Sequence, residues 1–177
     1  MNTTFRITEL RKTPPVIAAL ADMLIEAVAS GASVSFMHPL GPRAAAAFWE
    51  ASLSAAERGE RVVFGSHDGD ALIGTVTMLL DTPPNQPHRA EIAKLMTRVA
   101  YRGRGVGREL MAAAEHAARE GGRTLLTLDT AADGGAAKLY EGLGFELTGE
   151  IPDYALKPHG GLTGTLIYWK RIGELAR

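Results

Sequence analysis

The sequence contains no cysteine. Disulfide bonds, a thiolate nucleophile and a metal site built on thiolates are therefore excluded. The chain also has little charge of one sign, because 19 Lys and Arg residues offset 20 Asp and Glu residues and leave a formal net charge of -1. No overall electrostatic field favours nucleic acid or an anionic membrane surface as a partner.

Long hydrophobic runs are also missing. The most apolar window, Val16–Ala29, is interrupted by Asp22 and Glu26, so it does not predict a membrane span. Residues 1–9 lack the long apolar core typical of a signal peptide, and we expect a soluble cytoplasmic protein. The five histidines are scattered without the i,i+4 spacing of a helical zinc site, so we expect no metal.

The 177 residues are 46% hydrophobic and 22% charged, which is ordinary for a globular protein and predicts a single domain over 1–177. Hydrophobic periodicity, prolines and glycines predict helices at about 14–30, 42–58, 106–120 and 133–143. The strands are predicted at 5–10, 61–66, 71–80, 89–97, 124–130, 145–150 and 164–171. Antiparallel hairpins at both ends and alternating strands and helices in the second half indicate an α/β (α+β) fold with a mixed sheet. Ile92 and Leu95 break the alternation of the fourth strand and predict a bulge there.

A glycine-rich stretch, Arg102-Gly103-Arg104-Gly105-Val106-Gly107, precedes the third predicted helix. Bare backbone can approach a ligand closely, and the free N–H groups at the start of a helix form an anion site. A P-loop is excluded, because Arg108 and Glu109 stand where lysine and serine or threonine are required. A dinucleotide fingerprint is disfavoured, because Arg108 occupies the place of its third glycine. The sequence therefore predicts a phosphate or pyrophosphate site.

Arg102, Gly105 and Gly107 match the Arg/Gln-x-x-Gly-x-Gly/Ala motif of the GNAT N-acetyltransferases. The resemblance spans more than 50 residues in the family's order. It includes Glu91–Thr97, the helix as far as Glu120, the strand at 124–129, Ala136–Tyr140 and Gly142–Phe145. Within the family the chain is most similar to the tabtoxin-resistance type, through its length, the 31–37 loop, Glu91–Met96, 128–130 and Ile167-Tyr168. Ser35 and His38 depart from that relative, in a loop that would approach the substrate.

This resemblance implies a GNAT fold of six to seven mostly antiparallel strands, with a central splayed parallel pair and about four helices. It also implies that acetyl-CoA is the cosubstrate, with its pantetheine arm in the gap of the splayed pair. A backbone N–H near Met96 would then polarise the thioester carbonyl. The implied coenzyme-binding residues are Leu95, Met96, Thr97, Arg102, Gly103, Arg104, Gly105, Val106, Gly107 and Arg108.

Amine acetylation needs a group that accepts a proton from the amine and a donor for the departing thiolate. Glu91 and Asp129 are both placed to accept the proton, and the sequence does not choose between them. A strand glutamate can instead be solvated, and Asp129 can instead cap the next helix. Tyr140 matches the family's general acid, and its ordinary pKa of about 10 keeps it protonated at neutral pH; packing in the core is the alternative role.

With no cysteine to form an acyl-enzyme, we expect direct transfer in a ternary complex. The expected acceptor is the primary amine of a small amino-acid-like molecule, toxin or antibiotic. A protein or peptide amine and a non-catalytic acyl-CoA-binding sensor are the alternatives. Phe36, His38 and Tyr154 are expected to line the acceptor pocket, while Trp49 is expected in the core. Both a monomer and a homodimer are compatible with the sequence.

Overall fold

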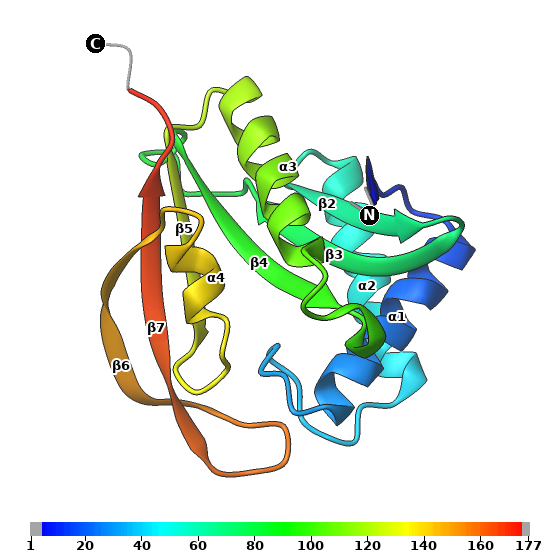
Figure 1. Cartoon of the computed structure of the whole chain (residues 1–177). Coiled ribbons are helices and arrows are strands. Elements are labelled where there is room, and N and C mark those ends of the chain that lie inside the picture. Colours follow the sequence, from blue (N-terminus) through cyan, green and yellow to red (C-terminus); the bar gives the residue numbers. More distant parts are fainter. Residues whose placement is uncertain (1–4, 175–177) are drawn as a thin grey trace.

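The computed structural model describes residues 5–174, which form one seven-stranded sheet with helices on both faces (Figure 1). The strand order is β1-β2-β3-β4-β5-β7-β6. In chain order the elements are β1 (Arg6–Glu9), α1 (Pro14–Ala29), α2 (Pro42–Glu57), β2 (Arg61–Asp68), β3 (Ala71–Leu79), β4 (Arg89–Thr97), the 3₁₀ turn η1 (Val99–Tyr101), α3 (Val106–Glu120), β5 (Leu125–Ala131), α4 (Ala137–Glu141), β6 (Glu146–Leu156) and β7 (Leu162–Arg171). The predicted mixed, mostly antiparallel architecture is confirmed.

The sheet separates two hydrophobic clusters. On one face, α1 and α2 bury Leu24, Trp49 and neighbouring residues against β2 and β3, and Trp49 is completely buried as expected. On the other face, α3 packs with Leu110 against β2, β3 and β4. The contact of α3 with β3 is close because Gly74 has no side chain: a Cβ there would lie 2.7 Å from Val106 Cγ1. This contact places the start of α3, and so the glycine loop, beside the centre of the sheet.

The parallel pair β4 and β5 is joined over only part of its length. Hydrogen-bonded pairing runs from Arg89–Ile92 on β4 to Leu125–Leu128 on β5. Beyond these residues the two strands diverge, which Figure 1 shows as an opening between β4 and β5. The predicted splay is therefore present, and within residues 5–174 one backbone edge of residues 93–97 has no strand partner.

The predicted bulge in β4 is confirmed. Thr75 of β3 lies opposite Met96, but Thr77 lies opposite Ala93, so Lys94 and Leu95 together face the single residue Val76. Lys94 has a φ of 53°, which is unusual for a residue with a side chain. The extra residue changes the side of the sheet to which the following side chains point.

Two elements depart most from their predicted bounds. The helix expected at 133–143 covers only Ala137–Glu141, since Asp133–Gly135 form a turn in which Gly135 has a φ of 75°. The strand expected to end at residue 150 continues to Leu156, because it pairs along β7 as an edge strand. An irregularity between Ile151 and Ala155 accommodates Pro152 within it.

Candidate active site

The glycine loop presents unpaired backbone donors at the start of α3. Gly103 and Gly105 have φ values of 75° and 88°, in the left-handed region that favours glycine. Among the described residues, no group accepts a hydrogen bond from the amides of Gly103, Gly105, Val106, Gly107 and Arg108. A Cβ on Gly105 would meet no atom within 4 Å, so the backbone is open to a ligand. Five free N–H groups at the positive end of a 15-residue helix suit a diphosphate.

Helix α1 holds the segment that leads into this loop. Glu26 accepts hydrogen bonds from the Val99 amide at 2.6 Å and from Arg98 Nη1 at 2.7 Å. Burial alone would raise the pKa of Glu26, but these hydrogen bonds outweigh it and hold the pKa below its usual value. Arg102 donates to Ser30 Oγ at 2.8 Å. The Arg98 guanidinium is thus engaged in fixing the loop and is not available as a free cation.

The remaining charged side chains of the loop are exposed. Arg104 lies over the Tyr101 ring, with its guanidinium carbon 5.0 Å from the ring centroid. Arg108 donates to the carbonyl of Gly142 at 3.3 Å. In the adjoining part of β4, Met96 is buried, while Leu95 and Thr97 are half-buried. The unpaired edge of residues 93–97 offers backbone donors and acceptors to an extended ligand arm.

Tyr140 is buried, with 6% of its surface exposed. Its ring packs between those of Phe145 and Tyr168, with both centroid distances 6.0 Å. Within residues 5–174 its hydroxyl has no hydrogen-bond partner. Burial, and then the negative charge of Asp129, raise the pKa of Tyr140 to about 12. The phenol is therefore neutral over the whole physiological range and keeps a proton to donate.

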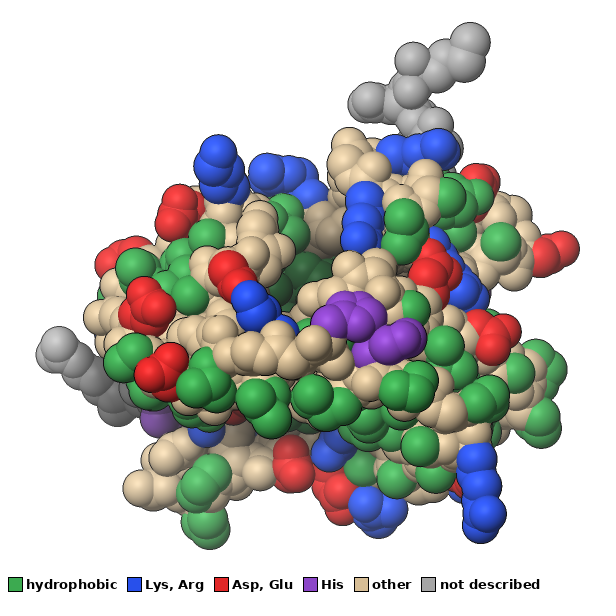
Figure 2. Space-filling view, turned by 90° about the horizontal axis from the view of Figure 1, so that it is seen from below, with side chains coloured by type: hydrophobic (Ala, Val, Ile, Leu, Met, Phe, Trp, Pro, Cys, Tyr) green, Lys and Arg blue, Asp and Glu red, His purple; other side chains and the backbone are tan. Residues whose placement is uncertain are grey.

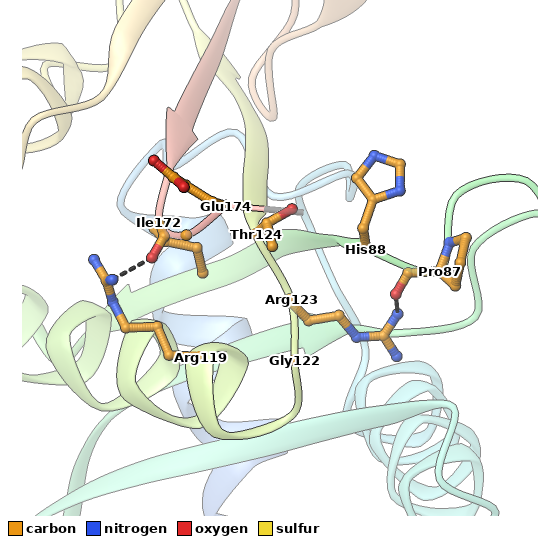
Figure 3. A pocket seen from close by; sticks show the side chains of 9 residues that line it. Pro87, His88, Arg119, Gly122, Arg123, Thr124, Ile172 and Glu174 are labelled. Carbon is orange, nitrogen blue, oxygen red and sulfur yellow. Dashed lines mark hydrogen bonds between the residues drawn. The ribbon is translucent and has the colours of Figure 1, made fainter. Parts of the chain in front are cut away.

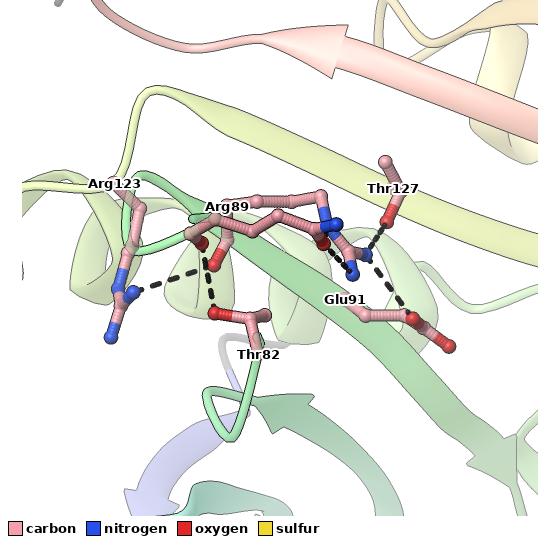
Figure 4. Close-up of polar contacts among 6 residues, drawn as sticks. Thr82, Arg89, Glu91, Arg123 and Thr127 are labelled. Carbon is pink, nitrogen blue, oxygen red and sulfur yellow. Dashed lines mark hydrogen bonds and ion pairs between the residues drawn. The ribbon is translucent and has the colours of Figure 1, made fainter. Parts of the chain in front are cut away.

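Glu91 and Asp129 lie on the sheet face that carries α1 and α2, because their strand neighbours Ile92 and Leu128 are buried against α3. Arg89 orients Glu91, since its Nη1 is 3.3 Å from Glu91 Oε2 and 2.9 Å from Thr127 Oγ1 (Figure 4). The hydroxyl of Thr165 donates to Asp129 at 3.1 Å. Asp129 does not cap α4, whose N-cap is Ala136 without a side-chain hydrogen bond.

The loop between α1 and α2 and the turn between β6 and β7 meet at the open end of the splay. The ring centroids of His38 and His159 are 4.5 Å apart, and the His38 amide donates to the Pro158 carbonyl at 2.9 Å. In Figure 2 the two adjacent histidines lie beside a hollow in the surface. Phe36 packs edge-on against Phe48, with 5.2 Å between the two ring centroids. Tyr154 lies in β6 and is 57% exposed, whereas a loop position was expected.

Two residues beside the carboxylates were not singled out in the sequence. Arg89 could not be recognised, because its contact with Thr127 joins positions 38 apart in the chain. Lys94 was signalled only indirectly, by the broken alternation of β4. Its ammonium lies 3.1 Å from Ser35 Oγ and 5.8 Å from the centroid of the Phe48 ring.

A separate cavity of about 590 Å³ lies where β5 begins, at the other end of that strand from Asp129 (Figure 3). It is lined by Pro87, His88, Arg119, Gly122, Arg123, Thr124, Ile172, Gly173 and Glu174. Both arginines of this cavity donate hydrogen bonds to backbone carbonyls: Arg119 to that of Ile172 and Arg123 to that of Pro87. The cavity therefore does not belong to the site at the splay. Residues 5–174 hold no cluster of three or more His, Asp or Glu side chains suited to a metal ion.

This combination of splayed parallel strands, free loop amides and a buried tyrosine defines a class of enzyme. The chain belongs to the acetyltransferase (GNAT) family, whose model matches residues 25–145. It is an acetyl-CoA-dependent N-acetyltransferase. None of the helices described in residues 5–174 is long and apolar enough to cross a membrane.

Solved structures share the fold at low sequence identity. The chain is similar to yncA from Salmonella typhimurium, solved with its cofactor acetyl-CoA, at 20% identity and a TM-score of 0.78, covering 97% of this chain and 96% of the other. It is similar to the ribosomal-protein-alanine N-acetyltransferase of Brucella melitensis at 20% identity and a TM-score of 0.78, covering 94% and 99%. An aminoglycoside 6'-N-acetyltransferase complexed with coenzyme A gives 18% identity and a TM-score of 0.74, covering 97% and 99%. Because these acceptors differ so widely, the fold alone does not identify the acceptor.

Proposed function

We propose that the enzyme acetylates the primary amine of a small amino-acid-like molecule, toxin or antibiotic, in the manner of the tabtoxin-resistance type. The observation that carries this proposal is the pair of carboxylates, Glu91 and Asp129, on one side of the splay with neutral Tyr140 packed on the other face. A carboxylate in such a position can attract an ammonium group and then take its proton. The formal net charge of -1 provides no basic track for an extended acidic peptide.

The residues present fit acetyl-CoA. The free amides from Gly103 to Arg108 would hold the diphosphate, and the exposed Arg104 and Arg108 would lie near the phosphates. The unpaired edge of residues 93–97 would hydrogen-bond the pantetheine arm. A backbone N–H near Met96 would stabilise the carbonyl oxygen as it becomes negative.

For transfer, Glu91 or Asp129 accepts a proton from the acceptor ammonium, directly or through a water molecule. The amine nitrogen then bonds to the thioester carbonyl carbon while the carbon–sulfur bond breaks. Tyr140 donates its phenolic hydrogen to the departing sulfur, and the second proton that the nitrogen loses as the amide forms returns to the phenolate oxygen, directly or through water. The burial that raises the pKa of Tyr140 also disfavours a charged thiolate beside it. Protonation of the sulfur as the carbon–sulfur bond breaks is therefore favoured.

The proposal is tested by free-thiol release from acetyl-CoA with small amines, aminoglycosides and peptides. We expect turnover with small amino-acid-like amines. Glu91→Gln and Asp129→Asn each remove one of the two candidate bases. The substitution that removes the actual general base should lower kcat about 10²- to 10⁴-fold and leave the affinity for the coenzyme unchanged. Asp133→Asn is the matched control, because Asp133 accepts a hydrogen bond from Thr163 as Asp129 does from Thr165. Faster turnover of peptides, or coenzyme binding without turnover of any amine, would contradict the proposed acceptor.

A further inference from the structure

The β4 bulge turns Lys94 toward the acceptor side of the sheet. Ala90 and Ile92 are buried against α3, and strict alternation would place residue 94 with them. Instead the Lys94 ammonium lies near Phe48 of α2 and Ser35 of the α1–α2 loop, on the other face. Met96 follows the same reversal and is buried in the α1–α2 cluster. The extra residue in β4 thus places a cation on the face that holds Glu91.

Both residues of the contact between Lys94 and Ser35 have an unusual backbone conformation. Among the described residues, Ser35, Lys94 and Asp153 are the non-glycine residues with positive φ, at 72°, 53° and 52°. Two of these three, Ser35 and Lys94, are hydrogen-bonded to each other at 3.1 Å. Strained backbone concentrates where function requires a particular side-chain position.

Lys94 is half-buried, and its ammonium has no carboxylate within ion-pair distance among residues 5–174. Asp129 and Glu91 are its charged neighbours from β5 and β4; their charges favour its protonated form, while burial has the larger effect and lowers its pKa. Ser35 uses one of its three N–H donors. A cation with free donors beside two carboxylates is the complement of a molecule that carries both an amine and an anionic group.

We propose that Lys94 binds the carboxylate of the acceptor and so selects amines that bear a carboxylate close to the reacting nitrogen. This inference rests on the proposed small-molecule acceptor and adds the residue that recognises it. Glu91 and Asp129 face the amine end, and Lys94 faces the acid end. The hydroxyl of Ser35 holds the ammonium in place, and Phe48 covers its side chain.

The test compares common L-amino acids, each paired with its α-carboxamide, as acceptors in the thiol-release assay. The carboxamide keeps the amine and removes the negative charge, so it is an internal control. For wild-type enzyme we expect a lower KM for the acid than for its amide. Lys94→Met should raise KM for the acid about 10- to 100-fold, with little change for the amide, and Lys94→Arg should restore most of the preference.

Three results would overturn the inference. Equal weakening of acid and amide by Lys94→Met would indicate a packing role. A loss of kcat on both, with KM unchanged, would indicate proton transfer. Absence of a preference in wild-type enzyme would remove the need for a carboxylate site. If no amine is acetylated, the proposed acceptor is refuted. Calorimetric titration of the coenzyme A complex with the same acid and amide pairs then tests the role of Lys94 separately, because the inference requires the acid to bind more tightly than the amide.

Discussion

Gly105→Ala tests the assignment of the glycine loop. Gly105 has a φ of 88°, and a methyl group there would stand in open space beside the free amides. A side chain in the left-handed region costs about 1–2 kcal/mol. For a chain of this size, each 1 kcal/mol lowers Tm by about 2–4 °C, so the variant should melt about 2–8 °C below wild type and remain folded at 25 °C.

The effect on coenzyme binding should be larger. Hydrogen bonds to charged groups contribute about 1.5–3 kcal/mol each. If the methyl group prevents two of the five free amides from reaching the diphosphate, about 3–6 kcal/mol is lost. This corresponds to roughly a 10²- to 10⁴-fold increase in the Kd for coenzyme A.

Gly59→Ala is the matched control. Gly59 follows α2 with a φ of 76°, and a Cβ there would also meet no atom within 4 Å. It should have the same loss of Tm and bind coenzyme A as wild type does. Calorimetric titration of the three proteins with coenzyme A gives the comparison. Wild-type affinity in a folded Gly105→Ala protein, or an equal loss in both variants, would refute the loop assignment.

The remaining predictions concern the proton donor and a pH-dependent ion pair. Tyr140→Phe should lower kcat about 10²-fold or more with little change in coenzyme affinity, while Tyr168→Phe, which loses only a hydrogen bond to Glu141, should keep kcat within a few-fold. Because the pKa of Tyr140 is raised to about 12, kcat should show no alkaline decline attributable to this group up to about pH 10; a limb near pH 9 that disappears in Tyr140→Phe would contradict this. Burial raises the pKa of Glu115, but hydrogen bonds from Lys170 and Arg119 outweigh it and the net shift is downward. Its folded carboxylate therefore adds stability above its ordinary pKa of 4.5, and this is lost as the pH falls through the lower folded value. Urea unfolding should show Glu115→Gln less stable than wild type by about 1 kcal/mol at pH 7, with the difference shrinking below pH 4; a constant difference would exclude ionisation as the cause.

Much of the fold follows from local patterns. Prolines at the first turns of α1 and α2 and glycines after their ends act over a few residues, and the helix bounds were predicted closely. The glycine loop is also local, since its free amides result from residue type and from the start of a helix. For α4, the same reasoning failed because Asp133 is bonded to Thr163 and Lys157 of β7 and the preceding loop, which a local pattern does not contain.

The sequence alone determined the order of elements, the position of the glycine loop and the residue types present for acetyl transfer. Only the tertiary structure decided which of them meet. Arg89 reaches Glu91 and Thr127 because the register of two parallel strands sets them side by side. The broken alternation in β4 predicted a bulge, but strand pairing decided that Lys94 turns toward Ser35. Such contacts depend on strand register and on the packing of distant helices, so they are settled when the chain folds as a whole.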